Sequence, residues 1–139
     1  MGEDRLRIFG EIKISDIMVN TPLYITPNEK ISKTELLMIR KNINGLPVVD
    51  DNNKVIGIIT QRDIRLARFA ISLESSKTLV KNLMTPEPYT IKANDSIKKA
   101  LEIMFENNIE RLPVVNDNNE LIGLVLEKMI LQKLLEYLN

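Results

Sequence analysis

The feature that most constrains the fold of this chain is an internal repeat. The run Leu-Pro-Val-Val begins at Leu46 and again at Leu112, an offset of 66 positions. Repeats of this length are whole supersecondary units. Because two copies are too few for a solenoid, we expect the halves to pack face to face about a pseudo-twofold axis. The same offset, without a gap, relates Met18, Ile25, Met38 and Gly57 to Met84, Ile91, Met104 and Gly123.

The hydrophobic pattern predicts the same order of elements in each half, and therefore an α+β fold. Each unit should contain a helix turn, strand, helix, strand, strand and helix, with a short mixed three-stranded sheet and two helices on one face. The elements expected in the first half are a turn at 14–18, a strand at 23–25, a helix at 30–41, strands at 46–49 and 55–59, and a helix at 61–69.

The repeat also predicts the domain organisation. Residues 71–78 are the only stretch with the composition of a linker. The predicted divisions are an N-terminal leader at 1–12, a first domain at 13–70, the linker at 71–78 and a second domain at 79–139.

The composition excludes several classes of function. The chain has 139 residues with neither Cys nor His. Disulfides, thiol nucleophiles, imidazole bases and the usual zinc ligands are therefore impossible. No catalytic residues and no metal site are predicted, and any metal would be a hard cation brought in by a phosphate ligand.

The charge and hydropathy of the chain bear on its partners and location. Lys and Arg total 19 and Asp and Glu total 19, so no net field attracts nucleic acid or anionic lipid. No apolar run is long enough to span a bilayer, and the N-terminus lacks the apolar core of a signal peptide. We therefore expect a cytoplasmic protein.

The segment Gly57–Asp63 is the strongest candidate for a functional site. The apolar run that ends at Ile59 predicts a strand, and Thr60 is placed to begin a helix with Asp63 three positions later. Thr and an acidic residue at this spacing form a capping box. The same groups could bind a ligand, since a helix N-terminus accepts phosphate and a carboxylate accepts ribose hydroxyls. From this segment alone the cap is the more frequent role.

The second half lacks this polar pair. Leu126 stands in the place of Thr60, and Met129 in the place of Asp63. A purely structural cap should be needed in both copies, although packing can replace one. The asymmetry therefore favours a ligand site that occurs once per chain.

With these motifs in place, the chain resembles a tandem pair of CBS domains, the module named after cystathionine beta-synthase. The resemblance covers about residues 13–138, so we expect no catalytic domain within these 139 residues. The motifs that carry it are Asp16–Met18 and Asn82–Met84 at the entries, Leu46–Asp50 and Leu112–Asn116 at the second strands, and Gly57–Asp63.

The resemblance implies a regulatory module that binds AMP, ADP, ATP or S-adenosylmethionine in the cleft between the two domains. Thr60 and Asp63 match the family's positions for phosphate and ribose. The facing half would contribute Pro88, Tyr89, Ile109, Arg111 and Lys128. Tyr89 and Ile109 could sandwich an adenine, and Arg111 and Lys128 could neutralise phosphate.

Each of these residues also has a structural interpretation. Tyr89 is more often a core residue of a strand, and Lys128 a solvated helix charge. For Arg111 a phosphate contact and a surface charge are about equally expected. The symmetry-related cleft at Leu126 and Met129 offers neither hydroxyl nor carboxylate, so we expect it to be empty or to take a ligand without ribose recognition.

The leading hypothesis is thus an adenosyl-ligand sensor that forms a homodimer through apolar helix positions and regulates an unidentified protein. The alternative is an interaction module with no ligand. An enzyme is less favoured, since no paired acid and base are evident, and nucleic-acid binding less still. The sequence does not specify which adenosyl ligand binds or which protein is regulated.

Overall fold

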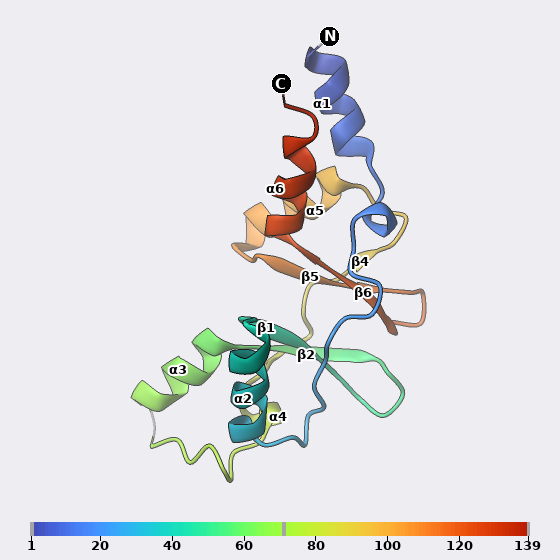
Figure 1. Ribbon diagram of the computed structural model, residues 1–139. Helices are drawn as coiled ribbons and strands as arrows, with labels where there is room; N and C mark the ends of the chain where they lie inside the picture. The colour runs from blue at the N-terminus through green and yellow to red at the C-terminus, as the bar shows by residue number, and fades with distance from the viewer. Residues whose placement is uncertain (1, 71, 139) are drawn as a thin grey trace. The chain divides into compact units, whose positions relative to one another are not determined.

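The computed structural model describes residues 2–70 and 72–138 (Figure 1). These residues form two compact units. Unit 1 comprises the described residues of Met1–Pro22 and Tyr89–Asn139, and unit 2 comprises those of Leu23–Pro88. In chain order, the elements are α1 (Gly2–Glu11), a 3-10 turn η1 (Ile14–Asp16), α2 (Ile31–Lys41), β1 (Gly45–Val49), β2 (Val55–Thr60), α3 (Gln61–Ala70), α4 (Val80–Leu83), β3 (Thr85–Pro86), β4 (Ile91–Lys92), α5 (Ile97–Asn107), β5 (Arg111–Val115), β6 (Leu121–Leu126) and α6 (Glu127–Leu135).

Unit 2 is a three-stranded sheet in the order β1-β2-β3 with α2 and α3 on one side (Figure 1). β1 and β2 form the predicted hairpin, with Gly45 opposite Thr60 and Val48 opposite Gly57. Residues along β2 alternate between buried and half-buried, as expected for a sheet covered on one face. The core of the unit consists of Ile31, Met38, Leu46, Val48, Ile59, Ile64 and Val80.

Unit 1 repeats this plan with a sheet in the order β4-β5-β6. β4 runs parallel to β5, and β5 runs antiparallel to β6 with Arg111 opposite Leu126. α1 is additional to the repeat, and Phe9 on it is buried and meets the ring of Tyr137 edge-on. The core consists of Phe9, Ile14, Ile91, Ile97, Ala100, Met104, Leu112, Val114, Val125 and Ile130.

The two units exchange their entry segments. The turn at Ile14–Asp16 belongs to unit 1, where Val19 pairs with Leu124 of β6. In the same way β3, which follows the linker, pairs with β2 of unit 2. Each sequence repeat therefore completes its sheet with a segment from the other repeat.

The fold class predicted from the sequence is confirmed, with a difference in strand pairing. The sheet of unit 1 is mixed, as expected. That of unit 2 is antiparallel, because the predicted strand at 23–25 contributes only an isolated parallel bridge between Ile25 and Val48. The domain limits at 13–70 and 79–139 stay a prediction about sequence modules, since the compact units are assembled differently.

The predicted linker at 71–78 belongs to unit 2 and is hydrogen-bonded to the start of α2. Residue 71 lies outside the described residues. Ser32 N donates to Ser75 O at 2.8 Å, and Ile31 N donates to Thr78 O at 2.9 Å. These bonds satisfy backbone donors at the start of α2. Over the part of the chain that the structure describes, helices are too short or too polar to cross a membrane.

Candidate functional site

The N-terminus of α3 carries the predicted polar pair, and the pair forms a capping box. Thr60 N donates to Asp63 Oδ2 at 2.9 Å, and Asp63 N donates to Thr60 Oγ1 at 3.1 Å. Both residues are half-buried. The structural role of the pair is therefore present in the molecule. Both side chains can still form hydrogen bonds to a ligand, because a carboxylate accepts up to about four hydrogen bonds and the Thr hydroxyl can still donate.

The loop before β1 holds the first residue of α3. Gln61 N donates to Asn44 O at 2.8 Å, and Gln61 Nε2 donates to Ile43 O at 3.2 Å. Two of the first three N–H groups of α3, those of Gln61 and Asp63, are therefore bonded within unit 2. A phosphate at this helix end would depend on the Thr60 hydroxyl and the Arg62 N–H rather than on a fully open first turn.

The matching helix end in unit 1 keeps the backbone bond and lacks the box. Glu127 N donates to Glu110 O at 2.8 Å, as Gln61 N does to Asn44 O. Leu126 is the N-cap of α6 and makes no side-chain cap bond. The turn from β6 to α6 therefore forms without a polar pair. The equivalent turn from β2 to α3 in unit 2 should not need the Thr60 hydroxyl and the Asp63 carboxylate in order to form.

Three of the residues predicted for the facing half gather at this end of unit 1. Arg111 is the first residue of β5 and pairs with Leu126, the last residue of β6. Lys128 is the second residue of α6 and is exposed, and Ile109 is half-buried just before β5. One apolar and two cationic side chains therefore lie around the start of α6.

The remaining two predicted residues, Pro88 and Tyr89, are consecutive, and the division between the two units falls between them. Tyr89 is 57% exposed and precedes β4, whose Ile91 pairs with Val114, so the parallel register places Tyr89 at the Arg111 end of the sheet. Pro88 closes unit 2 after β3, which runs antiparallel to β2 and away from Thr60. Within unit 2 the fold does not bring Pro88 to the capping box.

Sequence reasoning missed one residue beside the capping box. Ile43 is half-buried, and its carbonyl accepts the side-chain amide of Gln61. It occupies the repeat position of Ile109, 66 positions earlier, and both follow an Asn in the left-handed conformation, Asn42 and Asn108, at φ 52°. The repeat alone could have identified it, because a residue predicted to wall a ligand in one copy has a counterpart in the other.

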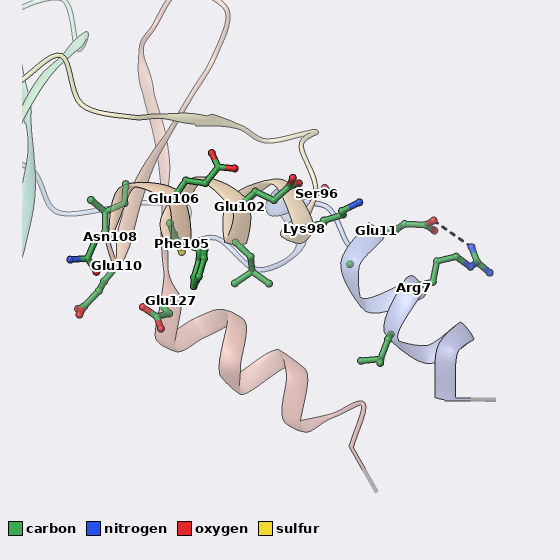
Figure 2. A pocket seen from close by; sticks show the side chains of 15 residues that line it. Arg7, Glu11, Ser96, Lys98, Glu102, Phe105, Glu106, Asn108, Glu110 and Glu127 are labelled. Carbon is green, nitrogen blue, oxygen red and sulfur yellow. Dashed lines mark hydrogen bonds and ion pairs between the residues drawn. The ribbon is translucent and has the colours of Figure 1, made fainter.

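Unit 1 also contains a groove of about 1090 Å³ between α1, α5 and the start of α6. Phe105 lies on the side of α5 where Glu127 begins α6 (Figure 2). Five glutamates and two basic residues are among the lining side chains: Glu11, Glu102, Glu106, Glu110, Glu127, Arg7 and Lys98. The apolar lining residues are Leu6, Leu101, Met104, Phe105 and Ile109, so the groove combines apolar side chains with mainly acidic charged ones.

The fold of the chain is similar to solved structures of CBS domain pairs. The CBS domain pair of protein MJ0100, in complex with 5′-methylthioadenosine and S-adenosyl-L-methionine, has a TM-score of 0.81 at 29% identity, covering 90% of this chain and 97% of that one. CBSX2, a CBS-pair protein from Arabidopsis thaliana, in complex with AMP, has a TM-score of 0.80 at 26% identity, covering 89% and 96%.

Relatives in sequence include inosine-5′-monophosphate dehydrogenases. The enzyme of Methanocaldococcus jannaschii is 33% identical over 121 residues, which are 87% of this chain and 23% of the enzyme. That of Halobacterium salinarum is 38% identical over 137 residues, which are 94% and 26%. The chain thus spans about a quarter of these enzymes, too little to carry over their activity.

The sequence profile described as "CBS domain" matches this chain twice, at residues 14–69 and 80–136. The two matches take in both copies of the repeat and most of the chain. Together with the fold, they establish that this chain belongs to the CBS domain family as a tandem pair.

Proposed function

We propose that this chain is a regulatory module that binds an adenosyl ligand at Thr60 and Asp63. The observation that carries the proposal is the polar pair at the start of α3, present once per chain in a fold whose solved neighbours include complexes with AMP and with S-adenosyl-L-methionine. The ligand would be AMP, ADP, ATP, S-adenosylmethionine or the thioether 5′-methylthioadenosine.

The proposed roles follow from the chemistry of each group. Asp63 accepts charge-assisted hydrogen bonds from the two ribose hydroxyls. The Thr60 hydroxyl donates a hydrogen bond to the first phosphate, or to the group that replaces it in a ligand without phosphate. Ile43 provides apolar contact from the same unit. Pro88, Tyr89, Ile109, Arg111 and Lys128 remain predicted contacts, with the two cations serving any phosphate.

A regulatory effect requires that the ligand distinguish two states of the chain. A ligand shifts an equilibrium only by its difference in affinity for the two states. We therefore propose regulation of a separate protein, in the cytoplasm, with no chemistry performed on the ligand. The second candidate function is an interaction module without a ligand.

A thermal-shift screen tests the proposal against that alternative. AMP, ADP, ATP, S-adenosylmethionine and 5′-methylthioadenosine are compared with GMP and GTP as base controls. A ligand at a hundred times its dissociation constant stabilises the folded chain by about 2.7 kcal/mol. At least one adenosyl compound should raise the melting temperature while the guanine nucleotides do not. No shift with any adenosyl compound at millimolar concentration would reject the proposal.

A further inference from the structure

A side-chain hydrogen bond ties the loop between α2 and β1 to the start of α3. Gln61, the first residue of α3, donates from Nε2 to the carbonyl oxygen of Ile43 at 3.2 Å. The two residues are 18 positions apart in the chain, and both are half-buried. The bond therefore fixes Ile43 next to the helix end that carries Thr60 and Asp63.

Gln61 completes the hydrogen bonding of this short loop. Residues 42–44 lie between the last residue of α2 and the first residue of β1. Ile43 N donates to Met38 O at 3.0 Å, and Asn44 O accepts from Gln61 N at 2.8 Å. The Gln61 side chain supplies a donor to the Ile43 carbonyl, so that both polar groups of the Ile43 backbone are bonded. The position of Ile43 is thereby set by the protein before any ligand binds.

The repeat position of Gln61 holds a residue that cannot make this bond. Glu127 stands there, and Ile109 stands at the position of Ile43. An ionised carboxylate only accepts hydrogen bonds, so the Glu127 side chain has no proton to donate to the Ile109 carbonyl. Glu127 N still donates to Glu110 O at 2.8 Å, which repeats the backbone bond of Gln61. Because unit 1 forms the same turn with this backbone bond, the turn does not require the side-chain bond of Gln61.

The two helix ends differ at three places that bear on the proposed ligand. The residues of unit 2 are Thr60, Gln61 and Asp63, and those of unit 1 are Leu126, Glu127 and Met129. Thr60 and Asp63 carry the groups proposed to bind the ligand, while Gln61 carries the donor that fixes the adjacent loop. The unit with the candidate binding groups is therefore also the unit in which a side chain holds the loop beside them.

We propose that Gln61 is a positioning residue for the adenosyl ligand and that it acts by holding Ile43 in place against the base. The inference rests on the proposed ligand site at Thr60 and Asp63. Gly45 pairs with Thr60, so the loop that contains Ile43 lies at the same end of the sheet as that site. Ile43 packs against the core of unit 2 and remains half-exposed, which leaves apolar surface for a ligand. A loop that is already ordered costs less entropy on binding, and this raises affinity.

Replacing the donor tests the role of Gln61. Gln61→Met removes the amide and keeps the length of the side chain. In calorimetric titrations with AMP and with 5′-methylthioadenosine, the variant should bind about two- to tenfold more weakly than the parent, as expected for one lost neutral hydrogen bond. The factor should be similar for both compounds, because the effect concerns the base and not the phosphate. Gln61→Glu, which carries the residue of unit 1, is a second variant, titrated with the uncharged 5′-methylthioadenosine.

A double-mutant cycle separates positioning from a general loss of structure. Ile43→Ala removes the side chain through which Gln61 is proposed to act. In the Ile43→Ala chain, Gln61→Met should therefore leave the affinity almost unchanged. Gln132→Met, on the exposed surface of α6, is the matched control and should bind like the parent. Circular dichroism should show that every variant is folded under the conditions of the titrations.

The outcomes distinguish this inference from the proposed function. A parent chain that binds neither AMP nor 5′-methylthioadenosine overturns both. A parent that binds while Gln61→Met and Gln61→Glu bind as tightly overturns the role of Gln61 alone. The same holds if Gln61→Met weakens binding equally with and without the Ile43 side chain, since Gln61 would then not act through Ile43.

Discussion

Asp63 serves the stability of α3 in the free protein, and this role can be measured without ligand. Its Oδ2 accepts from Thr60 N within the capping box. Asp63→Ala should lower the free energy of unfolding by about 1 kcal/mol, the usual cost of a lost cap interaction. Asp63→Asn, which keeps an acceptor oxygen, should cost less.

Urea unfolding of the two variants checks this prediction. Met129→Ala, the matched change in unit 1, is the control for losing side-chain atoms at the third position of the helix, since Met129 is half-buried and outside any box. If Asp63→Ala is as stable as the parent, the hydrogen bonds of the box contribute nothing and the helix end is held by Asn44 and Gln61 alone.

Gly57 lies where the entry segment of the second repeat, with Met84 and Thr85, packs closely against β2. A Cβ at Gly57 would lie 2.6 Å from Met84 Sδ and 3.1 Å from Thr85 O, on the strand that comes from the other repeat. We expect Gly57→Ala to destabilise the fold by about 1–3 kcal/mol through overpacking. Gly123 faces Met18 at the same 2.6 Å in unit 1, so Gly123→Ala should behave alike.

Gly10→Ala is the control for this prediction, because a Cβ there meets only Lys98 Cβ at 3.7 Å. Within α1 that change should be neutral or stabilising by up to about 1 kcal/mol. Thermal unfolding of the three variants decides the matter. A Gly57→Ala protein as stable as Gly10→Ala would mean that Met84 moves aside freely and does not lock β3 to β2.

At the scale of elements, an ion pair links α2 to α3. Arg68 Nη1 donates to Glu35 Oε2 at 2.6 Å, and Arg68 Nη2 bonds the other oxygen. The hydrogen bonds from Arg68, aided by its charge and opposed by burial, lower the pKa of Glu35 below 4.5. The Glu35 side chain is 26% exposed and that of Arg68 is 45% exposed. Solvent screening therefore limits the contribution of the pair to the free energy of unfolding to below about 1 kcal/mol.

The pair predicts a pH-dependent contribution to stability. A lowered folded-state pKa stabilises the fold above the unfolded-state pKa, near 4.5, and the contribution is lost as pH falls through the folded value. Glu35→Gln should therefore be slightly less stable than the parent at pH 7 and equal to it near pH 2. Denaturant titrations across this range would contradict the prediction if the difference were constant.

The helices and hairpins could be predicted from the sequence because their signals are local. The pattern around Met38 and Met104 marks α2 and α5, and the Leu-Pro-Val-Val runs mark β1 and β5. The exchange could not be predicted this way, since the hydrophobic pattern identifies a strand but not its partner. The pair Thr60 and Asp63 was predicted with its cap geometry. Ile43 was not, because an apolar residue beside a helix end has no local signature, and only its repeat position, matching Ile109, could have indicated it.

At the scale of the whole molecule, association and ligand binding are separable properties. Exposed apolar side chains such as Phe69 on α3 and Phe105 on α5 could support association, while the proposed ligand contacts begin at Thr60 and Asp63. An association through such apolar side chains should change little when the Debye length falls from about 10 Å at 0.1 M salt to about 3 Å at 1 M. Sedimentation at both ionic strengths tests this prediction, and a dimer that dissociates at 1 M salt would contradict it.

Calorimetric titration can show directly whether the Asp63 carboxylate holds an adenosyl ligand. The parent, Asp63→Asn and Met129→Ala are each titrated with AMP, ATP and S-adenosylmethionine. Loss of charge-assisted hydrogen bonds worth about 1.5–3 kcal/mol should weaken binding to Asp63→Asn by roughly ten- to a hundredfold. Met129→Ala should bind like the parent. Equal affinity for Asp63→Asn and the parent, or loss of binding in Met129→Ala alone, would contradict the account.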